Sequence, residues 1–223
     1  MRDTMKNRLS LLLSRLPKAL AILLLAGTAL LSSQAGAADK TPDDAKAFIQ
    51  NLAQQAISTV AQRDLSDSER NDRFRRLFVS SFDLPQISQF VLARYWRSAT
   101  PDQQQEFIKL FQEMQVLNWA QRFKDYKGEN LVATNAAKDG DKGFSVDSQL
   151  NHAPAQPLPV QWKVHQADDG QLRVTDIVVE GVSMAITQRS DYNSMLQGNG
   201  GKIDGLLTAL RTKVDQMRAS SGG

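Results

Sequence analysis

The residue types that most often bind metals or perform catalysis are few in this chain. His152 adjoins an expected loop and His165 falls on an expected strand, and the sequence contains no cysteine. Zinc and copper sites in proteins are built mainly from cysteine and histidine, and no group of carboxylates here has the spacing of metal ligands. The sequence therefore predicts no metal centre and no cofactor.

One pair of carboxylates has a spacing that could serve acid–base chemistry. Asp176 and Glu180 lie four residues apart on an expected strand, hence on one face, and either could be a general base if the sheet lined a cavity. The alternative is that both face water, as charged side chains usually do. Ser183 lacks both an obvious base and a G-x-S-x-G elbow, and the glycines in 198–201 lack the residues of a phosphate-binding loop. No catalytic residue is predicted.

The elements that would position these residues begin with four helices. Apolar residues at a spacing of three and four predict the helices, and capping residues predict where they begin. The four predicted starts are Thr41-Pro42-Asp43-Asp44, Ser66-Asp67-Ser68-Glu69, Asp83-Leu84-Pro85 and Thr100-Pro101-Asp102. The fourth helix is expected to end at Lys127-Gly128.

The pattern changes to period two after Gly128. Strands are predicted over 131–137, 144–150, 158–164 and 172–187, followed by helices over 191–196 and 203–217. Short connections favour an antiparallel meander. The predicted fold is α+β: a helical lobe (about 41–127 and 188–218) packs on a curved antiparallel sheet of four to five strands (about 130–187). Residues 38–223 would form one domain.

The last predicted strand is apolar on both faces near its middle. It runs through Ile177, Val178 and Val179 without a polar residue, meets Gly181, and resumes with Val182. We interpret Gly181 as a bend or bulge that curves the sheet. One face of this strand would then support the fold, while the other would wall an apolar space.

Large apolar side chains are frequent in the helical half and at Trp162 of the sheet. Such residues usually form a filled core. If they pack against a sheet whose inner side chains become small at Gly181, Ser183 and Ala185, they could instead leave an apolar pocket suited to a lipid. The sequence leaves both alternatives open.

The first thirty-seven residues read as a secretory signal peptide. A basic region is followed by thirteen apolar residues (19–31), too few for the roughly 20 of a membrane span, and by an A-x-A site that predicts cleavage after Ala37. This leader holds five of the 27 basic and one of the 24 acidic residues, so the chain from Ala38 carries 22 against 23. A basic field for nucleic acid is therefore not expected.

Three segments carry a resemblance to a known family. SFDLPQISQFVLARYWRSATPDQQQEFIKLFQ (81–112), FKDYKG (123–128) and DIVVEGVSMAITQRSDYNSML (176–196) resemble the MlaC proteins, also called toluene-tolerance proteins, which include a hopanoid-associated branch, HpnM. Where many relatives have glycine before the YWR motif, this chain has Ala93, which suggests a slightly different helix end.

The resemblance implies a soluble periplasmic carrier that holds the acyl chains of a phospholipid, or of a hopanoid-type lipid, in an apolar cavity. It implies exchange of lipid between an outer-membrane lipoprotein–porin complex and an inner-membrane ABC transporter complex, with no cofactor and no reaction. We expect a monomer. Two rivals remain: a periplasmic adaptor or chaperone without a cavity, and an enzyme on a cone-shaped α+β fold.

Under this reading the burial pattern selects candidate residues for the cavity and its surroundings. The expected wall consists of Phe78, Phe82, Val91, Leu110, Met114, Trp162, Val182, Met184 and Ile186, with Tyr192 and Met195 at a movable rim. Arg94 and Arg97 would meet a headgroup phosphate or dock on an acidic partner. The alternative for both is a solvated, charge-favourable helix end.

Overall fold

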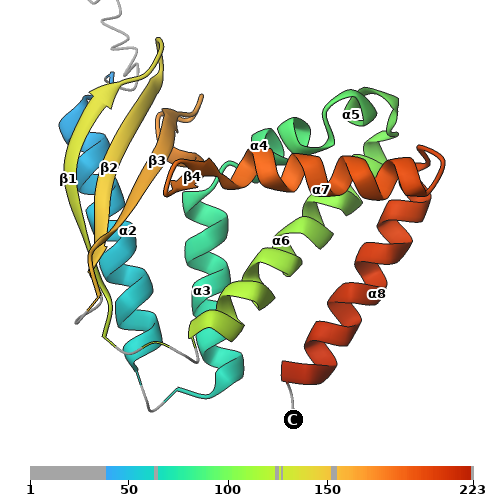
Figure 1. The fold of residues 1–223 in the computed structure, drawn as a ribbon, viewed down its shortest axis with the longest axis horizontal. Helices are drawn as coiled ribbons and strands as arrows, with labels where there is room; N and C mark the ends of the chain where they lie inside the picture. The colour runs from blue at the N-terminus through green and yellow to red at the C-terminus, as the bar shows by residue number, and fades with distance from the viewer. Residues whose placement is uncertain (1–38, 63–64, 124–125, 127, 152–154, 222–223) are drawn as a thin grey trace, which may run out of the picture. The chain divides into compact units, whose positions relative to one another are not determined.

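The computed structural model describes residues 39–62, 65–123, 126, 128–151 and 155–221. The predicted signal peptide and His152 lie outside these residues. Within them the chain forms seven helices and one five-stranded sheet (Figure 1). The helices are α2 (Pro42–Ala61), α3 (Asp67–Ser81), α4 (Leu84–Leu92), α5 (Arg94–Ser98), α6 (Pro101–Phe123), α7 (Met184–Gly198) and α8 (Ile203–Ser221).

Capping boxes begin the first two described helices. The hydroxyl of Thr41 accepts from the N–H of Asp44 at 3.2 Å, and the Asp44 carboxylate accepts from the N–H of Thr41 at 2.9 Å. Ser66 and Glu69 repeat this reciprocal pattern at the start of α3. Each box satisfies backbone donors that the first turn of a helix leaves unpaired, which confirms the two predicted helix starts.

The strands form an antiparallel meander in chain order. They are β1 (Asn130–Lys138), β2 (Gly143–Asn151), β3 (Leu158–Gln166), β4 (Leu172–Val179) and β5 (Val182–Ser183). Direct neighbours across the sheet include Leu131 with Leu150, Leu150 with Leu158, and Trp162 with Ile177. Helices first, then a meander, then helices again is the predicted α+β fold.

Helix α2 covers part of one face of the sheet (Figure 1). Ala45 and Ile49 of the helix are fully buried against a cluster that includes Phe144 and Val146 of β2. Gln50 fastens the helix to β1: its amide donates to the carbonyl of Leu131 at 3.2 Å and accepts from the N–H of Ala133 at 2.9 Å.

A second apolar cluster lies among the remaining longer helices. It contains Phe107 and Phe111 of α6, Val91 and Leu92 of α4, and several leucines of α8. The Phe107 ring meets the Tyr192 ring of α7 edge-on, with centroids 5.4 Å apart. Burial raises the pKa of Tyr192 to about 12, with a smaller contribution from the charge of Asp191.

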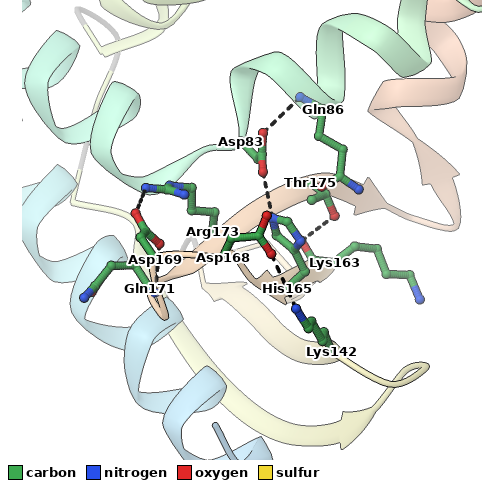
Figure 2. A network of polar contacts seen from close by, with 10 residues as sticks. All are labelled: Asp83, Gln86, Lys142, Lys163, His165, Asp168, Asp169, Gln171, Arg173 and Thr175. Carbon is green, nitrogen blue, oxygen red and sulfur yellow. Dashed lines mark hydrogen bonds and ion pairs between the residues drawn. The ribbon is translucent and has the colours of Figure 1, made fainter. Parts of the chain in front are cut away.

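Polar contacts join this helical part to the sheet at the end of α3 (Figure 2). The N–H of Asp83 donates to the carbonyl of Val174 in β4 at 3.0 Å. One carboxylate oxygen of Asp83 caps α4 by accepting from the N–H of Gln86 at 2.9 Å, and the other lies 2.8 Å from Nε2 of His165 in β3. A single side chain therefore fixes both the start of α4 and its position against the sheet.

The predicted long strand over 172–187 is wrong beyond Val179. Glu180 (φ 50°) and Gly181 (φ 81°) form a two-residue turn between β4 and β5, with the two positive φ angles of a type I′ hairpin. Gly181 is thus part of a reversal of the chain and not a bulge within one strand.

A helix begins directly after the short β5. The Ser183 hydroxyl accepts from the N–H of Ile186 at 3.0 Å, and Asp176 accepts from the N–H of Ala185 at 2.9 Å. These two acceptors satisfy the free donors at the start of α7. The helix therefore begins at Met184, seven residues before the predicted start, and the sheet ends at Ser183.

Candidate functional site

A cavity of about 530 Å³ lies where α2 and α3 face one end of the sheet. Its walls are almost entirely aliphatic and aromatic. The lining residues are Leu52, Ala53, Ala56, Ile57, Phe74, Leu77, Phe78, Phe82, Trp119, Arg122, Tyr126, Glu129, Leu131, Leu150, Leu158, Val160, Trp162, Ile177 and Val179. The volume falls within the ordinary range of about 300–1,000 Å³ for small-molecule pockets.

The helical wall follows from the spacing of residues along α2 and α3. Leu52, Ala53, Ala56 and Ile57 repeat at intervals of three and four and therefore share one side of α2. On α3, Phe74 and Phe78 lie one turn apart with ring centroids 6.0 Å from each other. Both helices thus present an apolar stripe to the same space.

Alternation along the strands builds the opposite wall. Leu158, Val160 and Trp162 are spaced two apart in β3, and Ile177 and Val179 hold the same relation in β4. The unbroken run at 177–179 is therefore still a two-faced strand, because Val178 points to the other face, beside its partner Gln161.

A buried hydroxyl holds the indole of Trp162 in this wall. The Trp162 Nε1 donates to Oγ of Ser148 at 2.9 Å, and that hydroxyl donates to the carbonyl of Val160 at 2.8 Å. Ser148 is only 3% exposed. The contact satisfies the one polar atom of Trp162, so the ring can face an apolar space without an unpaired donor.

The polar lining residues gather where α6 ends and β1 begins. Arg122 is in the last turn of α6, with its guanidinium carbon 5.6 Å from the centroid of the Trp119 ring. The Tyr126 hydroxyl donates to the carbonyl of Glu129 at 3.0 Å and so closes the connection between the two elements. The lining is therefore apolar over most of its extent and polar along one short segment.

Three of the predicted wall residues lie in the lining: Phe78, Phe82 and Trp162. Phe82 directly follows α3, and of the three it is the one that packs against both apolar clusters. Its ring centroid is 4.3 Å from that of Phe78. That these three side chains contact lipid stays a prediction.

The other predicted wall and rim residues lie elsewhere. Val91, Leu110, Met114 and Tyr192 pack in or against the cluster of α4, α6, α7 and α8. Val182, Ile186 and Met195 are 54%, 62% and 37% exposed, and Met184 begins α7. Because the chain turns at Gly181 and becomes helical at Met184, the wall candidates Val182, Met184 and Ile186 do not continue the β4 face as predicted.

Arg94 and Arg97 lie on α5, outside the cavity lining. Arg94 donates to the Tyr95 hydroxyl at 2.9 Å, with its guanidinium carbon 4.9 Å from the centroid of that ring. It also borders a shallow groove against Arg189 of α7. Both arginines are exposed; Arg97 lies in the last turn of α5, where a positive charge is favourable, whereas Arg94 is the first residue of that helix. Their contact with a headgroup or a partner stays a prediction.

The sequence reasoning missed the contribution of α2 and of the strand ends. Leu52 and Ile57 lie on a predicted helix, and Leu158 and Val160 share the parity of Trp162 on a predicted strand. Because alternate residues of a strand point to the same face, this spacing was a usable signal for the sheet wall. No signal in the sequence indicated that residues of α2 and α3 would line one cavity with the sheet.

The residues considered for catalysis have structural contacts instead. The Asp176 carboxylate accepts a hydrogen bond from the N–H of Ala185 at the start of α7, and the Ser183 hydroxyl caps that helix. Glu180 lies in the hairpin turn. His165 contacts Asp83, and Arg173 and Lys142 pair with Asp169 and Asp168 near the β3–β4 connection (Figure 2). Over the described part of the chain, no three His, Cys, Asp or Glu side chains are grouped to hold a metal.

The fold is a small α+β domain with an apolar cavity between its helices and its sheet. No helix among the residues described is long and apolar enough to cross a bilayer. A model of the MlaC protein family matches residues 50–212, which is most of the chain. The chain belongs to the MlaC family, as its sequence motifs indicated.

Two curated relatives carry family names. The intermembrane phospholipid transport system binding protein MlaC of Haemophilus influenzae is 25% identical over 213 residues, or 92% of this chain and 96% of the relative. A toluene tolerance protein of Pseudomonas putida is 24% identical over 134 residues, or 60% of this chain and 62% of that protein.

The fold is shared with a solved structure. A phospholipid-binding protein from Ralstonia solanacearum, determined in complex with a phospholipid, superimposes with a TM-score of 0.69 at 20% sequence identity. The match covers 78% of this chain and 98% of that one. The predicted α+β architecture is therefore also the fold of the Ralstonia protein.

Proposed function

We propose that this chain is a periplasmic carrier that binds phospholipid by enclosing its acyl chains in the cavity between α2, α3 and the sheet. The observation that carries the proposal is the apolar lining of a ligand-sized space within the domain. The names of the Haemophilus and Ralstonia proteins, which refer to phospholipid transport and binding, support the choice of ligand.

The physical requirement for such a carrier is a dry environment for the lipid tails. Removing one methylene group from an apolar phase into water costs about 0.8 kcal/mol, so exposed tails could not leave a bilayer at a useful rate. Walls such as Leu52, Phe78 and Val160 replace the contacts that the tails lose. The headgroup can remain in water, so few polar contacts are needed.

The predicted leader and the family define the proposed cellular context. A secretory signal peptide cleaved after Ala37 would deliver the protein to the periplasm. There it would exchange lipid between an outer-membrane lipoprotein–porin complex and an inner-membrane ABC transporter complex. Phospholipid is the proposed cargo, with a hopanoid-type lipid as the alternative that shares the same apolar chemistry.

The two rival functions receive less support. An enzyme would require Asp176 or Glu180 as a free base facing the cavity, but neither is among its lining residues. An adaptor or chaperone acting through its surface would have no use for an apolar space of this size. Neither rival therefore explains the cavity.

The direct test is lipid occupancy of purified protein. We expect organic extraction and mass spectrometry of protein prepared from the periplasm to yield phospholipid, and we expect the empty protein to take up lipid from vesicles. Well-folded protein that carries no lipid and takes up none would refute the proposal.

A matched pair of variants on α2 locates the lipid in this cavity. Ala56 lines the cavity, whereas Ala47 is an exposed residue of the same helix. Ala56→Trp should fill the space and reduce lipid occupancy severalfold, while Ala47→Trp should leave occupancy unchanged. Equal occupancy in both variants would place the lipid elsewhere.

A further inference from the structure

We infer that Arg122 binds the phosphate of the carried lipid at the polar end of the cavity, so that the site selects phosphate-bearing lipids over neutral lipids with the same tails. This inference rests on the proposed function. It assigns a role in ligand selection to one side chain, and it places the headgroup at the junction of α6 and β1, away from Arg94 and Arg97.

The first argument is the distribution of polarity around the cavity. Among the described lining residues, the charged ones are Arg122, in the last turn of α6, and Glu129, directly before β1. A two-tailed lipid that fills the apolar part must leave its headgroup where water or polar groups can meet it. The α6–β1 segment is the part of the lining that meets this requirement.

The second argument is the chemistry of Arg122. It is the one cation among the described lining residues, and a guanidinium can donate two parallel hydrogen bonds to phosphate oxygens. Its side chain is exposed, so a phosphate bound there stays at the mouth and keeps part of its hydration. Such a contact adds selectivity without the large cost of burying an anion.

The third argument is that Arg122 already has a defined position. Its guanidinium carbon is 5.6 Å from the centroid of the Trp119 ring, a cation–π distance, and Trp119 itself lines the cavity. Contact with the ring limits the freedom of the side chain, so less entropy is lost when a ligand binds. The same contact places the cation beside the apolar wall that the tails would touch.

The carboxylate of Glu129 belongs to the same end of the lining and opposes a purely electrostatic attraction of anions. A guanidinium offers a phosphate two directed donors in addition to its charge. For that reason Arg122→Lys, which keeps the charge but loses the paired donors, should recover only part of the selectivity.

The experiment compares two probes that differ only in the headgroup. A phospholipid and the diacylglycerol with the same two acyl chains are titrated into delipidated protein. We expect wild type to bind the phospholipid more tightly, Arg122→Gln to lose about three- to tenfold in phospholipid affinity, and its diacylglycerol affinity to stay unchanged.

Control variants separate this inference from the proposed function. Arg97→Gln, an exposed arginine outside the lining, should change neither affinity, and circular dichroism should report an intact fold for every variant. Equal losses for both probes in Arg122→Gln, or no loss for either, would overturn the role of Arg122 while leaving lipid binding in place. Wild-type protein that binds neither probe would overturn both proposals.

Discussion

Two regions of this protein are built from the same kinds of side chains, yet one is filled and the other is hollow. Around Phe107, helices α3, α4, α6, α7 and α8 bury a continuous cluster, to which α8 alone supplies Leu206, Leu207 and Leu210, and Phe78 of α3 lies at its border with the cavity. Between α3 and the sheet, Phe78, Trp162 and Leu52 face one another across a cavity. Aromatic and aliphatic content therefore does not decide whether a space is filled.

The two regions differ in which elements hold them together. In the filled region, residues from several helices meet, and Phe107 and Leu206 are fully buried. In the hollow region, α2 is fastened to β1 through Gln50, while α3 is fastened to β4 through Phe82 and Asp83. Each helix is held by its own strand, and residues of both helices and of the sheet line the cavity.

The largest expected effect comes from deleting a ring in the filled region. Phe107→Ala should lower the free energy of unfolding by about 3–5 kcal/mol, because the surrounding helices cannot collapse onto the void. Phe78→Ala should cost less, about 2 kcal/mol, since Phe78 already borders open space. Urea denaturation of delipidated protein measures both values. Equal losses would mean that the two regions are packed alike.

Adding volume tests the same contrast in the opposite direction. Ala99→Phe, in the filled cluster, should destabilise the protein by about 1–3 kcal/mol through overpacking. Ala56→Phe, in the cavity lining, should change stability little, because space for the ring exists. Thermal unfolding of the two variants compares them directly. A large loss for Ala56→Phe would contradict the cavity.

A charged group inside the helical region provides a pH-dependent test. Glu113 of α6 is 8% exposed and lies between Arg75 of α3 and Arg218 of α8; Nη2 of Arg75 is 3.1 Å from Oε1 of Glu113. Burial by itself raises the pKa of Glu113, but hydrogen bonds and charge from Arg75, with help from Arg218, outweigh it and hold the pKa below its ordinary 4.5.

Because the folded-state pKa is the lower one, this carboxylate stabilises the fold above pH 4.5, and the contribution disappears as the pH falls through the folded value. Glu113→Gln should therefore cost about 1–2 kcal/mol at pH 7, a value limited by the partial exposure of both arginines. The difference from wild type should shrink in urea titrations near pH 3. A difference independent of pH would exclude this linkage.

Local signals explain which parts of the fold could be predicted from the sequence. Thr41 with Asp44 and Ser66 with Glu69 fix two helix starts through contacts three residues apart, so no tertiary information is needed. The error at 180–187 has an equally local cause. Val182, Met184 and Ile186 alternate like a strand, but Ser183 caps a helix only because the Glu180–Gly181 turn and Asp176 place it there.

The candidate site was less predictable, for a physical reason. Phe78, Phe82 and Trp162 could be chosen because large apolar residues on facing elements tend to meet. Whether they meet in contact or across a gap depends on how each helix is placed against the sheet. Long-range contacts such as that of Gln50 with β1 contribute to this placement, and no spacing within a single element encodes them.

The smallest expected effect concerns a strained turn at the edge of the filled region. Ala93 joins α4 to α5 with φ 52° and ψ −120°, a conformation that favours glycine. Ala93→Gly should stabilise the protein by about 1 kcal/mol, because relief of strain exceeds the added entropy of the unfolded chain. Urea denaturation midpoints measure the gain.

The control for this change is Ala47→Gly, at an exposed position inside α2, which should instead lose about 1 kcal/mol of helix propensity. Opposite signs for two identical substitutions would locate the strain at the turn, whereas a loss at both sites would contradict it. Val91 and Leu92, immediately before the turn, are fully buried. Since strain persists only where surrounding packing enforces it, a gain at Ala93 would also measure how firmly the filled region holds its helices.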